Sequence, residues 1–146
     1  MFNFKDRVVV ITGASSGLGM QMARGFAEQG ANLVLTARRL EKLEALAEEL
    51  KSEHGIKALP IQCDVTKPEQ VNEAAAQAKE KFGKVDVLIN NAGSAKNAGV
   101  LEMTDDEWDF TIDTDMNSVF YVTRAFANIM KENNYGRIIN ISSMYG

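Results

Sequence analysis

The chain reads Thr12-Gly13-Ala14-Ser15-Ser16-Gly17-Leu18-Gly19 directly after the apolar run 7–11, and the amphipathic stretch 18–29 follows it. This is the order of a strand, a glycine-rich turn and a helix. The first backbone N–H groups of a helix have no partner within it and carry partial positive charge, so an anion can bind there without a cationic side chain. We therefore expect this turn to bind the phosphates of a nucleotide, the plainer alternative being a purely structural strand-to-helix connection.

The three glycines of this turn have separate expected roles. Gly13 can take the positive φ of a tight turn, and Gly17 leaves room where a pyrophosphate approaches the backbone. Gly19 lets the helix pack close to the preceding strand. The spacing between Gly13 and Gly17 differs from the more familiar GxGxxG pattern.

Length, composition and charge limit the class of protein to which this chain can belong. A chain of 146 residues with 45% hydrophobic and 25% charged residues is typical of one soluble globular domain, which we place at residues 1–146. The net charge of -4 repels nucleic acid and anionic membranes. Segment 1–6 lacks the basic start of a secretory signal, and no apolar stretch approaches the roughly twenty residues that span a membrane. We expect a cytoplasmic protein without a nucleic-acid or membrane partner.

The chain contains a single cysteine and a single histidine. One cysteine excludes an internal disulfide and a cysteine-rich metal site, and the apolar run around Cys63 predicts a buried side chain. His54 precedes Gly55 at an expected helix end, where we predict an exposed residue without a chemical role. We expect no bound metal.

Short apolar runs alternate with longer segments of helical period along the chain. The expected strands are 7–12, 32–37, 57–62, 85–90 and 136–141, and the expected helices are 17–29, 40–54, 69–82 and a long region over 105–133. Because the strands are nearly continuous in apolarity, we expect both faces of each to be covered. The order predicts an α/β fold with a doubly wound parallel sheet, the Rossmann fold, of which the chain holds the first five strands. We expect a ligand crevice at the carboxyl ends of the strands, bordered by the first and the fourth.

Residues typical of helix starts and ends support these boundaries. Gly30, Gly55 and Gly83 follow the first three helices at the usual stop position. The tetrads 66–69 and 104–107 both fit capping boxes. Segment 94–99 consists mostly of small residues and is flanked by glycine, so we expect it to form a mobile loop over the crevice. The long helical region has large apolar residues that we expect in the core or against another subunit: Trp108, Phe110, Phe120, Phe126, Ile129 and Met130.

Four motifs, in order along the chain, resemble those of the short-chain dehydrogenase/reductase family. The stretch 12–19 is similar to the family's TGxxxGxG cofactor turn, and Asp64-Val65 to its adenine-contacting pair after the third strand. Asn90-Asn91-Ala92-Gly93 matches NNAG after the fourth strand, and 139–143 completes the set at the fifth. The resemblance implies that the cofactor is bound by Gly13, Ser15, Ser16, Gly17, Leu18, Gly19, Arg38, Asp64, Val65, Asn91, Ala92 and Gly93.

Some of these motif residues also have plainer interpretations. Asp64 can accept a hydrogen bond from an adenine amino group while Val65 offers an apolar surface, but an Asp at such a turn is often only a cap. The small residues Ala92 and Gly93 allow backbone contact with a ribose. For Asn90, a structural role that ties the fourth strand to its neighbour is at least as strong an interpretation as ligand contact.

The residue that follows the second strand distinguishes NAD from NADP. A carboxylate there binds the ribose 2′-hydroxyl of NAD, whereas a cation accommodates the 2′-phosphate of NADP. The chain has Ala37-Arg38-Arg39 and no acid, and the guanidinium of Arg38 offers a planar pair of donors to a phosphate. The Ser15 hydroxyl can add a contact. We expect NADP, with NAD as the second choice; the alternative is that both arginines are only solvated residues at a helix start.

The resemblance also implies two catalytic positions. Ser143 corresponds to the serine whose hydroxyl hydrogen-bonds the substrate carbonyl, while a tyrosine whose pKa is lowered by a lysine transfers the proton. In the family that YxxxK segment lies beyond the fifth strand, and this chain ends at Gly146 before it. Asp115 lies five residues before Phe120, where the family has a catalytic asparagine. Asn117 is turned by roughly 200° along a helix and cannot face the same crevice. An ionised carboxylate only accepts hydrogen bonds, so a water relay through position 115 would change.

These features together predict an NADP-preferring oxidoreductase that interconverts a secondary alcohol and a ketone, with this chain as its cofactor-binding and partly catalytic front portion. Within the family the chain is most similar to gluconate 5-dehydrogenases and 3-oxoacyl-carrier-protein reductases, and the resemblance implies a homo-oligomer, a dimer or tetramer. The alternative is a nucleotide-binding module without catalysis. A nucleotide-dependent methyltransferase with a similar sheet is disfavoured by Asn91-Ala92-Gly93 and Ser142-Ser143.

Overall fold

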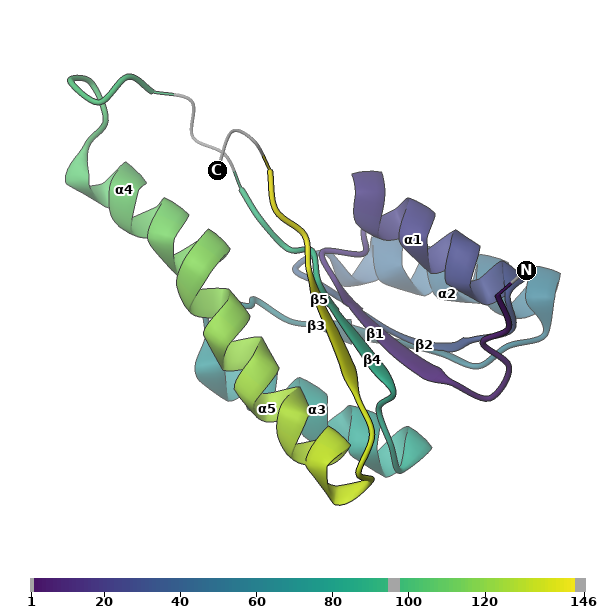
Figure 1. The fold of residues 1–146 in the computed structure, drawn as a ribbon. Coiled ribbons are helices and arrows are strands. Elements are labelled where there is room, and N and C mark those ends of the chain that lie inside the picture. The colour runs from purple at the N-terminus through teal and green to yellow at the C-terminus, as the bar shows by residue number, and fades with distance from the viewer. Residues whose placement is uncertain (1, 95–97, 144–146) are drawn as a thin grey trace.

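A parallel sheet of five strands forms the centre of the molecule (Figure 1). The computed structural model describes residues 2–94 and 98–143. The strands are β1 (Val8–Thr12), β2 (Asn32–Ala37), β3 (Ala58–Gln62), β4 (Val87–Asn90) and β5 (Arg137–Asn140), and their order in the sheet is β3-β2-β1-β4-β5. Every neighbouring pair is parallel. The predicted doubly wound α/β sheet is therefore confirmed, and its strand order reverses between β1 and β4 as expected.

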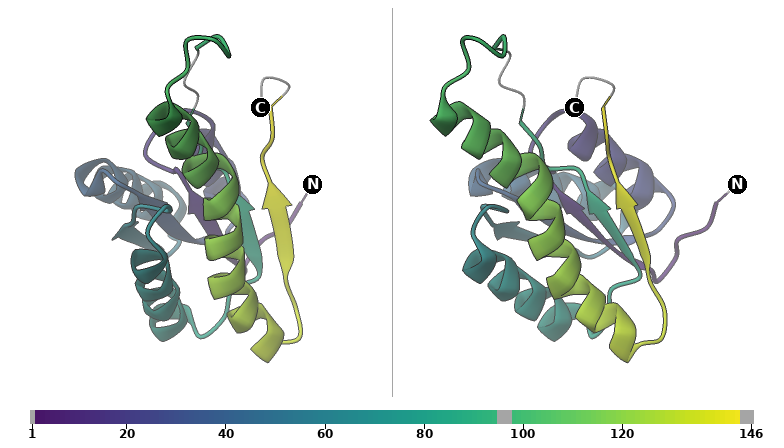
Figure 2. Two further views of the ribbon diagram at one scale, coloured as in Figure 1. Left: turned by 90° about the vertical axis from the view of Figure 1, so that its left-hand side faces the viewer. Right: turned by 60° about the vertical axis from the view of Figure 1, so that its left-hand side comes forward.

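Helices cover both faces of the sheet (Figure 2). The helices α1 (Gly17–Glu28) and α2 (Leu40–His54) pack on one face, and α3 (Pro68–Phe82) and α5 (Ser118–Glu132) pack on the other. Because side chains alternate along a strand, β1 contributes to two cores. Val9 and Ile11 pack with α1 and α2, while Val8 and Val10 pack with α3 and α5. Both faces of β1 are therefore buried, as expected for the central strand of the sheet.

The helical region over 105–133 consists of three elements. These are α4 (Asp105–Ile112), one π-helical turn called η1 (Asp113–Asn117), and α5. At the end of η1 the Ser118 amide donates to the Asp113 carbonyl, five residues back instead of the four of an α-helix. In Figure 1 the three elements run on as one long rod beside the sheet. Single π turns inside α-helices are frequent at functional sites.

One of the two predicted capping boxes is wrong. The helix α3 begins at Pro68 after Lys67, whose side chain caps no amide, and the Thr66 hydroxyl donates to Asp64 Oδ1 at 2.8 Å instead. A proline at the first helical position has no amide to satisfy, and the carboxylate is the stronger acceptor for the hydroxyl. The capping box at Thr104 is confirmed.

The expectation that both faces of every strand are covered is wrong for β5, since all four of its residues are exposed. This strand is the last in the sheet, and among residues 2–94 and 98–143 no segment pairs with its outer edge. Trp108 and Phe120 are also 57% and 59% exposed, whereas Phe126, Ile129 and Met130 are buried as expected.

Several smaller predictions are confirmed. Gly55 and Gly83 are the left-handed C-caps of α2 and α3, Cys63 is buried, and His54 is exposed. The loop predicted over 94–99 includes 95–97, which lie outside the described residues.

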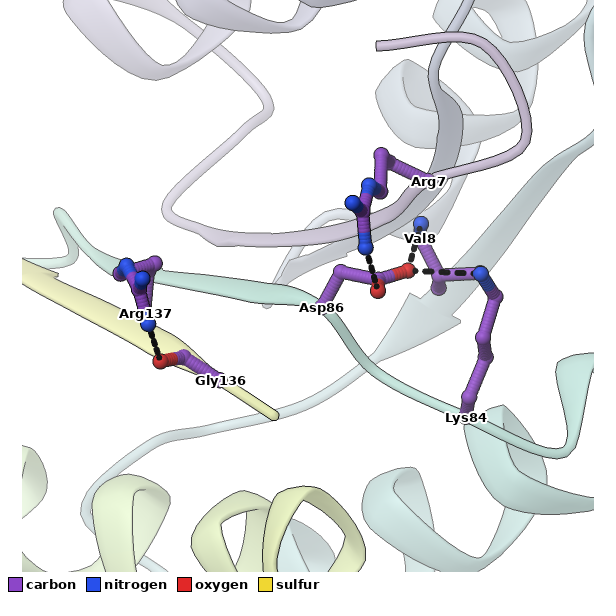
Figure 3. Close-up of polar contacts among 6 residues, drawn as sticks. All are labelled: Arg7, Val8, Lys84, Asp86, Gly136 and Arg137. Carbon is purple, nitrogen blue, oxygen red and sulfur yellow. Dashed lines mark hydrogen bonds and ion pairs between the residues drawn. The ribbon is translucent and has the colours of Figure 1, made fainter. Parts of the chain in front are cut away.

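A buried carboxylate joins the amino ends of β1, β4 and β5 (Figure 3). Asp86 is 4% exposed and accepts hydrogen bonds from the Val8 amide at 2.8 Å and from Arg7 Nη1 at 2.9 Å. Lys84 Nζ lies 3.1 Å from its second oxygen, and the Asp86 carbonyl accepts from the Arg137 amide at 2.9 Å. These contacts hold together the amino ends of the strands, at the opposite end of the sheet from the ligand crevice.

Candidate cofactor-binding site

A groove of about 360 Å³ lies at the carboxyl ends of the strands, at the reversal of strand order. Its walls come from the turn after β1, the ends of β2 and β3, the loop after β4, and two residues of the α4–η1 region. All the predicted cofactor-binding residues line this groove except Gly17 and Gly19, which lie beside it in the same turn. The sheet topology therefore brings together segments that are far apart in the sequence.

The turn after β1 has the backbone geometry expected of its glycines. Gly13 and Gly17 have φ angles of 66° and 54°, in the left-handed region that favours glycine. A side chain at Gly19 would overlap the Gly13 carbonyl oxygen, so only glycine lets α1 start this close to the turn. Gly17 borders open space, with nothing within 4 Å of a Cβ built there.

The start of α1 is open to an anion. Ser16 is the N-cap, its side chain caps none of the first amides among the described residues, and the first turn of α1 holds no acidic residue. These amides keep their partial positive charge and their capacity to donate. Together with the tight backbone turn at Gly13 and Gly19, these amides fit the diphosphate of a dinucleotide.

The Thr12 hydroxyl joins the phosphate turn to the loop after β4. Thr12 Oγ1 accepts from the amides of Asn91 at 3.0 Å and Ala92 at 2.9 Å, and donates to the Ile89 carbonyl at 3.4 Å. In the opposite direction, Asn91 Nδ2 donates to the carbonyls of Thr12 at 3.0 Å and Gly13 at 3.3 Å. These contacts hold two walls of the groove at a fixed separation. Thr12 was not among the predicted site residues, although a threonine that ends an otherwise apolar strand is the local signal.

The neighbouring Asn90 has the structural role that the sequence allowed. Its Nδ2 donates to Asn140 Oδ1 at 2.8 Å and to Thr123 Oγ1 at 3.1 Å, so it ties β4 to β5 and to α5. Asn90 does not line the groove.

Two arginines follow β2 at one end of the groove. Arg38 and Arg39 both line it and are exposed, and neither side chain has a hydrogen bond or ion pair within the described part of the chain. The backbone of Arg38 is held by Gln62, whose Nε2 donates to the Arg38 carbonyl at 2.9 Å. No acidic residue stands at this strand end before Glu41. The arrangement leaves two cationic side chains available to an anionic group.

The residues after β3 line the same end. Asp64 Oδ1 accepts from the Thr66 amide at 3.0 Å and the Thr66 hydroxyl at 2.8 Å, so this oxygen serves the local turn. The second carboxylate oxygen has no partner among the described residues. Val65 is 8% exposed and offers an apolar surface. Burial, reinforced by the charge of Asp64, raises the pKa of the Cys63 thiol to about 11, so Cys63 lines the groove as a neutral side chain.

The two predicted catalytic residues lie at this end of the sheet but outside the groove wall. Asp115, in η1, accepts a hydrogen bond from the Ser94 amide through Oδ1 at 2.8 Å. Asn117 instead donates to Asp113 Oδ1 at 2.7 Å, so of these two residues Asp115 contacts the loop after β4. Ser143 follows β5 and is exposed.

The family model described as short chain dehydrogenase matches residues 7–146. The chain belongs to the short chain dehydrogenase family. An uncharacterised oxidoreductase of Staphylococcus saprophyticus is 42% identical over 100% of this chain and 58% of its own length. The NADP-dependent mannitol dehydrogenase of Alternaria alternata is 37% identical over 100% of the chain and 56% of its own. The crystal structure of L-sorbose reductase from Gluconobacter frateurii, complexed with NADPH and L-sorbose, has a TM-score of 0.93 and 34% identity, over 97% of this chain and 54% of that one. The chain thus spans just over half the length of these relatives.

The groove is also lined by residues that the sequence motifs did not predict as ligand contacts. These are Ala37, Arg39, Cys63, Thr66, Ser94, Phe110 and Thr114. The last two come from the α4–η1 region, whose position over the sheet depends on tertiary packing. Among residues 2–94 and 98–143, no three His, Cys, Asp or Glu side chains gather closely enough to hold a metal ion. None of the helices in these ranges combines the length and the hydropathy that a membrane span needs.

Proposed function

We propose that this chain is the coenzyme-binding part, residues 1–146, of an NADP-preferring oxidoreductase that interconverts a secondary alcohol and a ketone. The observation that carries the proposal is the groove at the strand-order reversal. Within the described part of the chain, the first amides of α1 on one side of it have no side-chain cap, and the two arginine side chains on the other have no partner. An oxidoreductase is favoured over a nucleotide-binding module without catalysis because the related proteins are named as oxidoreductases, dehydrogenases and reductases.

The preference for NADP rests on the end of β2. A coenzyme with a 2′-phosphate brings two negative charges to this region, and Arg38 can donate two parallel hydrogen bonds to them. Ser15, which lines the groove nearby, supplies a hydroxyl. One relative is named NADP-dependent, and one similar structure was crystallised with NADPH. NAD is the second choice, because the residue that follows β2 is Arg38 and not an acid that could accept a hydrogen bond from the 2′-hydroxyl of NAD.

The remaining residues orient the coenzyme in this proposal. The amides of 13–19 bind the diphosphate, Asp64 and Val65 contact the adenine, and the loop 91–93 contacts a ribose. When bound, the coenzyme supplies or accepts the hydride. Ser143 donates a hydrogen bond to the substrate oxygen, and Asp115 holds the loop after β4 through the Ser94 amide.

We also propose a homo-oligomer in the cytoplasm, acting on a small-molecule alcohol or ketone. The exposed Phe120 and Met116, at 59% and 57%, give the α5 side of the rod an apolar surface that a second subunit would cover. The cytoplasmic setting rests on composition and stays a prediction.

Coenzyme titrations test the central proposal. We expect Arg38→Ala to weaken NADPH binding by about ten- to a hundredfold and NADH binding by less than about twofold, because a charged hydrogen bond contributes about 1.5–3 kcal/mol. Lys131→Ala, which removes an exposed charge at the far end of α5, is the control and should change neither dissociation constant. An NADPH to NADH ratio that is the same in wild type and Arg38→Ala would refute the assignment of Arg38.

A further inference from the structure

A cleft of about 340 Å³ lies between α1 and α2, which pack on the same face of the sheet (Figure 1). Its walls include Arg24 from α1, Glu49 from α2 and the glycine-rich turn at 15–17. Ser15 and Ser16 line both this cleft and the coenzyme groove. The width of the cleft is therefore also the distance between this wall of the groove and α2.

One bidentate ion pair spans this cleft. Arg24 Nε donates to Glu49 Oε1 at 2.8 Å, and Arg24 Nη2 donates to Glu49 Oε2 at 3.1 Å. Two parallel hydrogen bonds between a planar guanidinium and a carboxylate fix orientation as well as distance. The same contact raises the pKa of Arg24 and lowers the pKa of Glu49, so both groups are charged at neutral pH. Within α1 and α2, whose residues are all described, no other side-chain hydrogen bond or ion pair joins the two helices.

The starts of the same two helices form two ends of the proposed coenzyme site. The helix α1 begins at the phosphate turn, and α2 begins directly after Arg38 and Arg39. The buried stripe of α2 fixes the height of this helix over the sheet. Its sideways distance from α1 depends on the ion pair, because the cleft interrupts the packing between the two helices. A dinucleotide with a 2′-phosphate has to reach both helix starts at once, so this distance decides how well it fits.

We infer that Arg24 and Glu49 are positioning residues for NADPH, and that their ion pair holds Arg38 at the distance from the phosphate turn that one coenzyme molecule spans. The inference rests on the proposed function, because it requires that the diphosphate binds at 13–19 and the 2′-phosphate at Arg38. Neither Arg24 nor Glu49 lines the coenzyme groove, so both act through the turn and through Arg38. NADH has no 2′-phosphate to place at Arg38, so its binding depends much less on this distance.

The test removes one charge at a time and then restores the ion pair in reverse. NADPH and NADH are titrated into the intact wild-type chain, Arg24→Gln, Glu49→Gln and the double variant Arg24→Glu/Glu49→Arg. We expect each single variant to weaken NADPH binding by about two- to fivefold and NADH binding by less than about 1.5-fold, because a partly exposed ion pair contributes modestly. The double variant should restore most of the NADPH affinity. Lys51→Gln is the matched control, which breaks an ion pair of 2.8 Å within α2 and should change neither dissociation constant.

Long-range charge and loss of position make different predictions for the two single variants. Arg24→Gln removes a positive charge and Glu49→Gln a negative one, so charge alone would weaken NADPH binding in the first and strengthen it in the second. Unchanged NADPH binding, effects of opposite sign, or an equal loss for NADPH and NADH would overturn the inference. Urea unfolding without ligand measures any general loss of stability. Should the double variant not fold, a loss of NADPH affinity in both single variants with NADH affinity preserved is required. If wild type binds neither coenzyme, the proposed function itself is refuted.

Discussion

Removal of the Asp86 carboxylate should destabilise the fold by an amount that the structure sets. In Asp86→Ala the Val8 amide, in a residue that is 2% exposed, loses its acceptor, and an orphaned buried N–H costs about 1–3 kcal/mol. The side chains of Arg7 and Lys84 are 44% and 39% exposed, so water solvates them when the carboxylate is gone. We therefore expect a total loss of about 2–3 kcal/mol, below the cost of breaking a fully buried ion pair.

The assay is urea unfolding followed by circular dichroism at pH 7. A loss of this size shifts the midpoint by about 1 M for a protein of this length. Asp86→Asn keeps an oxygen for the Val8 amide and should lose less stability than Asp86→Ala. Asp109→Asn, at an exposed position without a partner among the described residues, is the control and should match wild type.

The stability that Asp86 contributes should also depend on pH. Burial raises the pKa of Asp86, but hydrogen bonds from the Val8 amide, Arg7 and Lys84 outweigh it, so the pKa lies below its usual value. A carboxyl whose pKa is lower in the folded state stabilises the fold above the unfolded pKa of about 3.9 and loses that contribution as pH falls further. The difference between wild type and Asp86→Asn should therefore narrow below about pH 4. A difference within experimental error at pH 7, or one that does not narrow in acid, would refute the reasoning.

Three other predictions concern the groove. Gly19→Ala brings a methyl group against the Gly13 carbonyl oxygen and should lower the free energy of unfolding, measured in urea, by about 1–3 kcal/mol. Gly25→Ala, which places its methyl group in open space on the same helix, is the control and should not lower it. Equal stability of the two variants would contradict the close packing at Gly19. In the complete oxidoreductase that we propose, Asp115→Asn should raise turnover with a ketone substrate by restoring an amide donor, and a fall would show that the assigned role is wrong. Because its pKa is about 11, Cys63 should react with a thiol reagent slowly at pH 8 in the folded chain and rapidly in urea, and fast labelling of the folded chain would contradict its burial.

The fold was predictable because its signals are local. The helix α2 has the predicted bounds, 40–54, since leucines at 43, 46 and 50 form one buried stripe and Gly55 stops the helix. The turn at 12–19 was predictable for the same reason, because its glycines act on their own backbone.

Features that depend on tertiary contacts were not predictable. Asp86 and Arg7 are 79 residues apart, and nothing in the sequence near Asp86 shows that the fold places Arg7 beside it. The capping prediction at 66–69 failed because Pro68 set the helix start and Asp64 competed for the Thr66 hydroxyl. Thr114 lines the groove only because the fold brings the π turn to the loop after β4, where Asp115 accepts a hydrogen bond from the Ser94 amide.

Binding of a diphosphate by the backbone of residues 13–19 is the central claim, and residue-resolved NMR tests it directly. NADPH is titrated into the labelled chain while backbone amide shifts are followed. We predict that the largest changes fall on Gly17, Leu18 and Gly19, with smaller changes at Arg38 and Asp64. Saturable binding of NADPH that leaves the amides of 13–19 unmoved, or no binding at all, would contradict the account.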